Sequence, residues 1–176
     1  MQGSMSICHN GNLVNANILK QKLEEQGSIF SSTSDTEVLG HLIKRQSGHM
    51  IDRICTSLDK LDGAFAFLIM VDNRIYAARD KYGLRPLSIG ILPNGAYVFA
   101  SETCALDVFG AKFVRDVEPG EIVRVKDGKL LSKIYTKYPL QDKICAIEYI
   151  YFSRPDSNLD GINVHTTRKL AGKQLY

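Results

Sequence analysis

The sequence predicts an α+β fold in which antiparallel strands pack against helices. Helical apolar spacing dominates the first 60 residues, whereas the patterns in the middle of the chain are those of strands. Turn-forming residues separate neighbouring strand patterns, which is typical of hairpins. Three helices followed by some seven or eight strands therefore indicate an antiparallel sheet covered by helices.

Each expected helix has its own signals. The helical patterns cover residues 15–26, the segment after Ser34, and residues 49–61. Gly27 supplies the left-handed residue that commonly ends a helix. Ser34 and Glu37 form an S-x-x-E capping box, which predicts the start of the second helix.

The expected strands come mostly in pairs. Hairpins are predicted around Asp72-Asn73, around Pro93-Asn94-Gly95 and from Asp127-Gly128 onward. Residues 4–9 are expected to form a short strand that leads into a turn at Asn10-Gly11. Towards the end, the expected order is a strand over residues 144–153, a long polar loop over 154–164, and the beginning of a helix from 165.

Composition and charge narrow the function classes. The chain is 44% hydrophobic and 23% charged, as in an ordinary soluble domain. Its net charge of +3 is spread without a basic block, so no nucleic-acid partner is expected. The longest apolar run, residues 64–71, is too short for a bilayer, so no membrane partner is expected. Four widely spaced cysteines without a CxxC pair predict a reduced, cytoplasmic protein.

Asn10, Gly11 and Asp35 are the candidate site residues. An amide side chain followed by the N–H of a flexible glycine offers two donors that can converge on an oxyanion. Asp35 lies in the first turn of a predicted helix, where the dipole favours a carboxylate and where it could hold a cationic group. Taken alone, a hairpin turn and a simple helix-start acid are the better explanations of these residues.

A second motif surrounds two arginines. In "RDKYGLRPLSIG", residues 79–90, Gly83 predicts a tight turn that presents Arg85. A buried structural ion pair of these arginines with Asp80 or Glu102 is favoured over direct contact with a ligand.

Several segments together resemble the family of glutamine phosphoribosylpyrophosphate amidotransferases (amidophosphoribosyltransferases). They are "CHNGNLVNA", "STSDTE", "RDKYGLRPLSIG", "FASETCALD", "VEPGE" and "EYIYFSRPDSNLDGINVH", in this order. Other class II glutamine amidotransferases share "HNGN", "RDxxGxRPL" and "ASE" more loosely, whereas "EPGE" and "EYIYFSRPDS" are specific to this family.

The resemblance implies an N-terminal-nucleophile sandwich of antiparallel sheets and helices. Residues 1–142 would form an incomplete glutaminase domain, and residues 143–176 would begin a phosphoribosyltransferase domain. Asn10 and Gly11 match the oxyanion hole, and Asp35, together with Gly11, matches the glutamine site, where the carboxylate holds the α-ammonium. The family transfers the amide nitrogen of glutamine to phosphoribosylpyrophosphate, giving 5-phosphoribosylamine in the first step of de novo purine biosynthesis.

The resemblance also implies what this chain lacks. The family nucleophile is an N-terminal cysteine in a "CGVFG"-like opening, which the sequence does not contain, and Cys8 is expected to be a packed apolar residue. The chain is therefore interpreted as an internal fragment that is itself inactive. Two alternatives are the glutaminase part of another class II amidotransferase and a non-catalytic glutamine-binding remnant.

Cofactors and assembly are expected only of the full-length protein. Cys145 matches a ligand of a [4Fe–4S] cluster in one subgroup, and a cluster needs about four thiolates, so this chain alone is expected to bind none. Mg²⁺ would accompany phosphoribosylpyrophosphate in the full-length protein. A homo-oligomer is expected for the complete enzyme, with glutamine and phosphoribosylpyrophosphate as its small-molecule partners.

Overall fold

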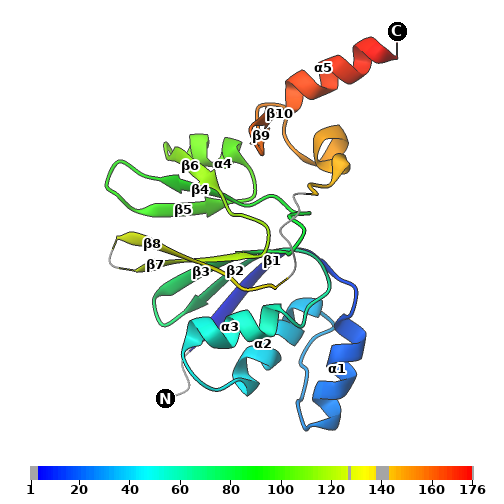
Figure 1. Ribbon diagram of the computed structural model, residues 1–176, viewed down its shortest axis with the longest axis vertical. Helices are drawn as coiled ribbons and strands as arrows, with labels where there is room; N and C mark the ends of the chain where they lie inside the picture. Colours follow the sequence, from blue (N-terminus) through cyan, green and yellow to red (C-terminus); the bar gives the residue numbers. More distant parts are fainter. Residues whose placement is uncertain (1–3, 127, 138–142, 176) are drawn as a thin grey trace.

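A computed structural model describes residues 4–126, 128–137 and 143–175, which form two stacked antiparallel sheets with helices on their outer faces (Figure 1). The helices are α1 (Ala16–Glu25), α2 (Asp35–Arg45), α3 (Met50–Leu58), α4 (Thr103–Val108) and α5 (Val164–Gln174), with a π-helical turn, η1 (Glu148–Phe152). The strands are β1 (Met5–Leu13), β2 (Gly63–Val71), β3 (Arg74–Arg79), β4 (Ser88–Ile91), β5 (Tyr97–Ala100), β6 (Lys112–Asp116), β7 (Glu121–Lys126), β8 (Lys129–Ile134), β9 (Asn158–Leu159) and β10 (Ile162–Asn163).

Strands β1 to β8 divide into a larger and a smaller sheet, and β9 and β10 pair only with each other. The larger sheet has the order β1-β2-β3-β7-β8, so β1 is an edge strand, and the smaller sheet has the order β5-β4-β6. Helices α1 to α3 cover the outer face of the larger sheet, and α4 lies on the outer side of the smaller one (Figure 1). The expected antiparallel sandwich with helices is therefore confirmed.

Alternation along β2 explains how one strand serves two cores. Phe65, Phe67 and Ile69 pack against the helices, while Ala66 belongs to the core between the sheets. Successive side chains of a strand point to opposite faces, so large residues fill the helix side and a small one lies where the sheets meet. Each fully buried large side chain of the helix-side core contributes roughly 1.5–3 kcal/mol.

Most of the expected helices and hairpins are confirmed. The three N-terminal helices fall within their expected segments, and α5 forms where a helix was expected. Asp72 and Asn73 have φ of 48° and 61°, which are the left-handed angles of a two-residue hairpin turn. The pairing of β7 with β8 matches the hairpin expected from Asp127 onward, although Asp127 itself lies outside the described residues.

The predictions of a turn at Asn10-Gly11 and of a full capping box at Ser34 were wrong. β1 continues through both residues to Leu13, because β2 offers a partner at every position. Ser34 caps α2 by accepting the Thr36 N–H, but the Glu37 carboxylate reaches back further than a capping box requires. It accepts the backbone N–H groups of two loop residues, Ser31 and Ser32.

The expectations for residues 144–164 were also wrong in part. The expected strand contains the π-helical turn η1, closed by the Ser153 N–H donating to the Glu148 carbonyl. The expected polar loop contains the short hairpin β9–β10, which turns at Asp160-Gly161 with φ of 46° and 78°. No sequence pattern predicted α4, a helix of only six residues.

Candidate functional site

Asn10 lies on the face of β1 that looks toward the second sheet. Cys8, Asn10 and Asn12 are exposed and alternate with more buried neighbours. Asn10 pairs with Ala66, a residue of the core between the sheets. The Asn10 Nδ2 donates to the Ser101 hydroxyl just after β5, over a long 3.4 Å. The candidate oxyanion amide is therefore held weakly at the edge strand.

Gly11 occupies a position that only glycine fits. Its φ is +144°, and a Cβ there would lie 2.0 Å from the Ala64 carbonyl oxygen. Backbone N–H groups alternate between the two edges of a strand. The Leu13 N–H, two residues further on, leaves the sheet to reach Asp35. Gly11 therefore lies two residues before the backbone group of β1 that reaches Asp35.

Asp35 joins the start of α2 to the end of β1. Its Oδ2 accepts the Leu13 N–H at 2.9 Å. Its Oδ1 lies 3.4 Å from the His9 Nδ1 and 3.4 Å from the Thr36 Oγ1. The Asp35 side chain is still 25% exposed, so part of the carboxylate remains open to a ligand.

A surface hollow of about 630 Å³ opens beside Asp35. Its lining residues are Asn12, Leu13, Val14, Ala16, Asn17, Thr33, Ser34 and Asp35. Asn10 and Gly11 are not among them. The structure thus brings Asp35 to the neighbouring backbone of β1, but it does not gather all three candidate residues around one hollow.

His9 was missed by the sequence analysis. Its side chain is 5% exposed, its ring stacks on Phe67 with 4.3 Å between centroids, and its Nδ1 lies 3.1 Å from the Thr36 Oγ1. Burial lowers the pKa of His9 and outweighs the opposing effect of the Asp35 carboxylate. Its position in β1 could have indicated that His9 lies near the candidate site, because residues 9, 11 and 13 share one face of the strand.

Arg79 and Arg85 are structural, as favoured, but their partners differ from those expected. Arg79, 1% exposed, donates to three backbone carbonyls and lies 3.4 Å from the Asp160 carboxylate. The carbonyls are those of Gly83, Arg85 and Val117. Arg85 forms an ion pair of 2.7 Å with the buried Glu148. These contacts tie the loop after β3 to the C-terminal segment.

The carboxylates expected to pair with these arginines bind mainly backbone N–H groups. Asp80 is fully buried and accepts four backbone N–H groups, those of Phe65, Tyr82, Leu84 and Arg85. Glu102 accepts the Arg154 N–H and the Ser157 hydroxyl, each at 2.7 Å. A tight turn gathers N–H groups that a buried carboxylate can satisfy at close range, so no arginine is required there.

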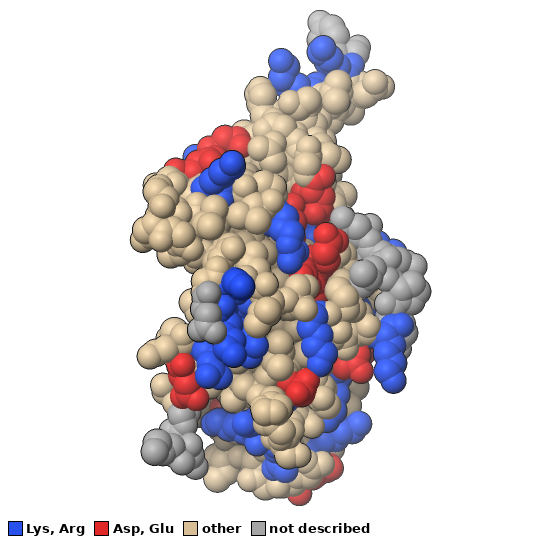
Figure 2. Space-filling view, turned by 60° about the vertical axis from the view of Figure 1, so that its left-hand side comes forward, with Lys and Arg blue, Asp and Glu red and all other residues tan. Residues whose placement is uncertain are grey.

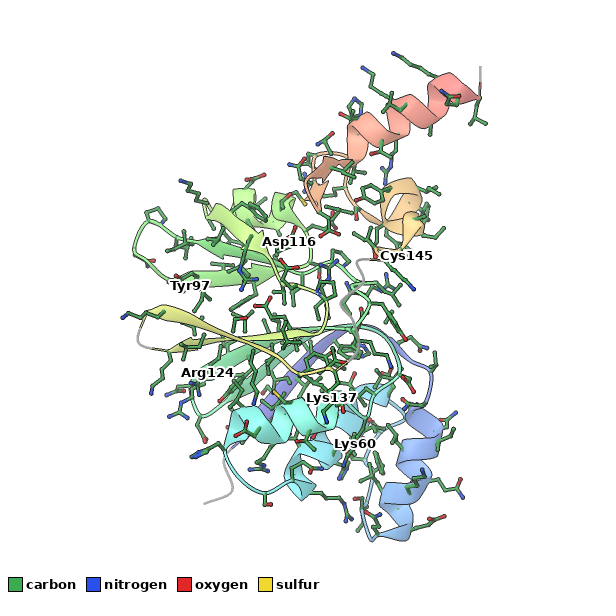
Figure 3. The ribbon with its side chains drawn as sticks, viewed as in Figure 1. Lys60, Tyr97, Asp116, Arg124, Lys137 and Cys145 are labelled. Atoms are coloured by element: carbon green, nitrogen blue, oxygen red, sulfur yellow. The ribbon has the colours of Figure 1, made fainter. Side chains whose placement is uncertain are left out.

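The cysteines do not form a metal centre. All four are free; Cys55 and Cys104 are buried, and Cys145, labelled in Figure 3, is half-buried before η1. Cys8 is exposed in β1, so the expectation that it is a packed apolar residue was wrong, because its side chain lies on the more exposed face of this edge strand. Within the described ranges, no group of three or more His, Cys, Asp or Glu side chains is arranged to hold a metal ion. In the same part of the chain, no helix is both long and apolar enough to cross a bilayer.

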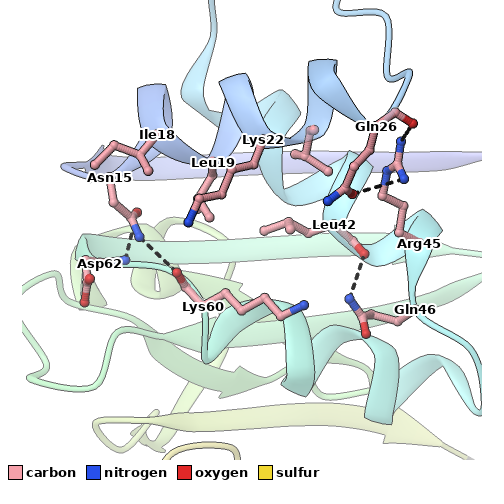
Figure 4. Close-up of a pocket in the computed structure, with 11 residues that line it drawn as sticks. Asn15, Ile18, Leu19, Lys22, Gln26, Leu42, Arg45, Gln46, Lys60 and Asp62 are labelled. Atoms are coloured by element: carbon pink, nitrogen blue, oxygen red, sulfur yellow. Dashed lines mark hydrogen bonds between the residues drawn. The ribbon is translucent and has the colours of Figure 1, made fainter.

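A larger hollow, of about 750 Å³, lies between α1 and α2 and contains none of the candidate residues. The side chains of Lys22 and Lys60 line it together with the apolar side chains of Leu19 and Leu42 (Figure 4). Both lysines are flexible surface groups, and nothing in the hollow resembles a reaction centre. On the face shown in Figure 2, acidic and basic side chains are intermixed.

Comparison with known proteins identifies the family. The family described as "Glutamine amidotransferase domain" matches residues 1–108. The chain is 58% identical over 175 residues to the amidophosphoribosyltransferase of Bacillus subtilis strain 168, covering 98% of this chain and 36% of that enzyme. It is 49% identical over 173 residues to the amidophosphoribosyltransferase of Staphylococcus aureus strain N315, covering 98% of this chain and 35% of that enzyme.

Solved structures agree. The glutamine phosphoribosylpyrophosphate amidotransferase of B. subtilis, complexed with ADP and GMP, superposes with a TM-score of 0.95 at 56% identity, covering 99% of this chain and 38% of that chain. A glutamine aminotransferase class-II domain protein from Silicibacter pomeroyi shares the fold alone, with a TM-score of 0.51 at 12% identity over 75% of this chain and 66% of that chain. The chain spans little more than a third of the amidophosphoribosyltransferases that it matches. On its sequence match and its sandwich of antiparallel sheets and helices, the chain belongs to the glutamine amidotransferase domain family.

Proposed function

We propose that this chain is the glutamine-binding part of an amidophosphoribosyltransferase. Such an enzyme is a glycosyltransferase that moves the amide nitrogen of glutamine to phosphoribosylpyrophosphate and yields 5-phosphoribosylamine, which opens de novo purine biosynthesis. The observation that carries the proposal is the 2.9 Å bond from the Leu13 N–H to the Asp35 Oδ2. This bond holds a carboxylate beside the strand that contains Asn10 and Gly11.

The distances suit glutamine. A strand rises about 3.4 Å per residue, so Gly11 and Leu13 are separated by roughly 7 Å, close to the span from the ammonium to the amide of an extended glutamine. On this proposal, Asp35 binds the α-ammonium, Gly11 also contacts the substrate, and the Gly11 N–H and Asn10 amide stabilise the oxyanion. The long contact with Ser101 leaves the Asn10 amide able to turn toward a ligand.

Cys8 is not the nucleophile on this proposal. It lies within β1, where its own nitrogen belongs to a peptide bond and cannot serve as the base that a terminal cysteine provides. We therefore expect residues 1–176 alone to hydrolyse glutamine no faster than their Cys8→Ala variant. Ammonia release well above that of the variant would contradict this assignment.

Titration with L-glutamine, followed by NMR at millimolar ligand, tests the glutamine site. We expect the amide signals of Gly11, Leu13 and Asp35 to shift with L-glutamine and not with N-acetylglutamine, which lacks the ammonium. Asp35→Asn should abolish the response, whereas Asp107→Asn on the exposed side of α4 should not. Equal responses to both ligands, or an unchanged response in Asp35→Asn, would contradict the proposal.

We further propose that the glutaminase domain covers residues 1–142 and that a phosphoribosyltransferase domain begins at about residue 143. Exposed large apolar side chains gather on η1 and α5, and contiguous patches of this kind mark interaction surfaces. They are Ile150, Tyr151, Phe152, Leu170 and Leu175. Such a surface supports packing against further protein.

The remaining proposals concern the whole protein. Mg²⁺ would accompany phosphoribosylpyrophosphate, but Cys145 supplies only one of the roughly four thiolates of an iron–sulfur cluster, so the residues present do not fit one. The four free thiols support a cytoplasmic location. A homo-oligomeric state rests on the family resemblance.

A further inference from the structure

His9 links β1 to the helix that carries Asp35, and the proposed glutamine site gives it no role. Its Nδ1 faces two oxygens, the Thr36 Oγ1 at 3.1 Å and the Asp35 Oδ1 at 3.4 Å. The Thr36 hydroxyl in turn donates to the same Asp35 oxygen at 3.4 Å. His9, Thr36 and Asp35 therefore form one hydrogen-bonded cluster.

The protonation of His9 follows from its surroundings. Burial lowers the pKa of His9, so the ring is neutral near pH 7 and carries one proton. A carboxylate can only accept a hydrogen bond, so the tautomer that bonds to Asp35 carries that proton on Nδ1. The Nε2 is buried and makes no well-formed hydrogen bond among the described residues, although the Ala64 backbone also acts on the ring and opposes the lowering of its pKa.

The unpartnered Nε2 is the unusual feature. A buried polar atom without a partner costs stability, and a phenylalanine would fill the same space against Phe67 without that cost. A buried polar group that costs stability points to a role in a site. The side of the ring that does have partners is the side that faces Asp35.

We propose that His9 is a positioning residue whose Nδ1–H, directly and through the Thr36 hydroxyl, holds the Asp35 carboxylate toward the hollow in the orientation that receives a ligand ammonium. The Leu13 N–H fixes Oδ2 alone and leaves the carboxylate plane free to swing about that bond. The contacts at Oδ1 fix the plane. This inference rests on the proposed glutamine site, because that site defines what the carboxylate binds.

Two variants separate this role from simple packing. His9→Phe keeps the ring on Phe67 and removes the donor, whereas His9→Asn removes the ring and places an amide N–H near the position of Nδ1. Thr36→Val removes the relay hydroxyl. If His9 positions Asp35, the variant that keeps the hydrogen-bond donor, His9→Asn, should still bind glutamine. If His9 acts only by packing, the variant that keeps the ring, His9→Phe, should still bind it.

Two readouts are needed. The Asp35 carboxyl carbon signal and the hydrogen exchange of the Leu13 amide report the carboxylate without any ligand, and the L-glutamine titration reports binding. We expect His9→Phe to fold as stably as the parent, to exchange its Leu13 amide about tenfold faster and to lose about tenfold in glutamine affinity. His9→Asn should recover most of the affinity while being less stable, and Thr36→Val should lie between.

The opposite pattern overturns the inference. If His9→Phe leaves the Asp35 and Leu13 signals unchanged, or if His9→Asn is as impaired as His9→Phe, the ring acts only by packing. If the parent chain shows no response to L-glutamine, that result contradicts the proposed function instead. The carboxyl carbon and exchange signals still test the role of His9 in that case.

Discussion

Gly11 shows most clearly how a single residue is constrained. Its positive φ and the closeness of the Ala64 carbonyl mean that Gly11→Ala must displace backbone, not a flexible side chain. We expect the free energy of unfolding to fall by about 3 kcal/mol or more, as measured by urea denaturation. Gly27→Ala is the matched control, because Gly27 also has a positive φ but nothing within 4 Å, and should cost about 1 kcal/mol. Equal losses would show that strain at φ alone explains Gly11.

His9 also predicts how stability depends on pH. Its pKa is lowered by burial, with the Asp35 carboxylate and the Ala64 backbone opposing the shift and Arg85 adding to it. Below the ordinary value of about 6.5, unfolded His9 binds a proton that folded His9 does not, so stability is lost as the pH falls from there. We expect His9→Phe to lose less stability than the parent between pH 7 and pH 5, as measured by thermal unfolding at both values. A steeper loss in the variant would contradict a neutral buried His9.

For single residues, the sequence could predict the local position of a side chain better than its contacts. Asp35 was expected at the start of a helix and lies there, because a dipole preference is local. The partners of Asp80 and Arg85 depend on which distant groups fold against them, and Glu148 lies 63 residues from Arg85. The sequence did not indicate a role for His9, because that role depends on its contact with Thr36, 27 residues away.

Among the elements, α2 depends on the loop before it. The Glu37 carboxylate accepts the N–H groups and hydroxyls of Ser31 and Ser32, and these bonds lower its pKa to about 2. We expect Glu37→Gln, which replaces one accepting oxygen by a donor, to speed hydrogen exchange at the Ser31 and Ser32 amides. Glu24→Gln on the exposed face of α1 is the control. Unchanged exchange would mean that the loop is held by other contacts.

Two similar turn signals had different outcomes, and the difference is physical. Asp72-Asn73 turns because the strands on either side of it pair with each other. Asn10-Gly11 remains extended because β2 pairs with β1 along all nine of its residues. The local sequence preference favours a turn at both sites, but strand pairing determines whether it forms. For Asn10-Gly11 the pairing strand is β2, which begins some 50 residues later in the chain.

The whole molecule consists of a packed sandwich and a C-terminal segment attached to it by polar contacts. Both apolar cores are built without residues 143–175. The segment is held by Arg85 with Glu148, by Arg79 with Asp160, by Glu102 with the Arg154 N–H and the Ser157 hydroxyl, and by Thr103 with the Asn158 N–H. The N–H groups of Lys143 and Cys145 also donate to the carbonyls of Tyr82 and Leu84. Its own buried apolar residues, Leu159 and Val164, belong to neither core. A segment held in this way should open locally without unfolding the sheets.

We therefore expect Glu148→Ala and Glu102→Ala to increase trypsin cleavage after Arg168 and Lys169 about tenfold, because each removes the acceptor of a bond that anchors the segment. The circular dichroism of the sandwich and the midpoint of its thermal unfolding should change little. Asp107→Asn, an exposed change on α4, should leave the cleavage rate unaltered. If either alanine variant instead lowers the midpoint of the whole chain without faster cleavage in the native state, the segment is an integral part of the sandwich. It would then unfold only together with the two sheets.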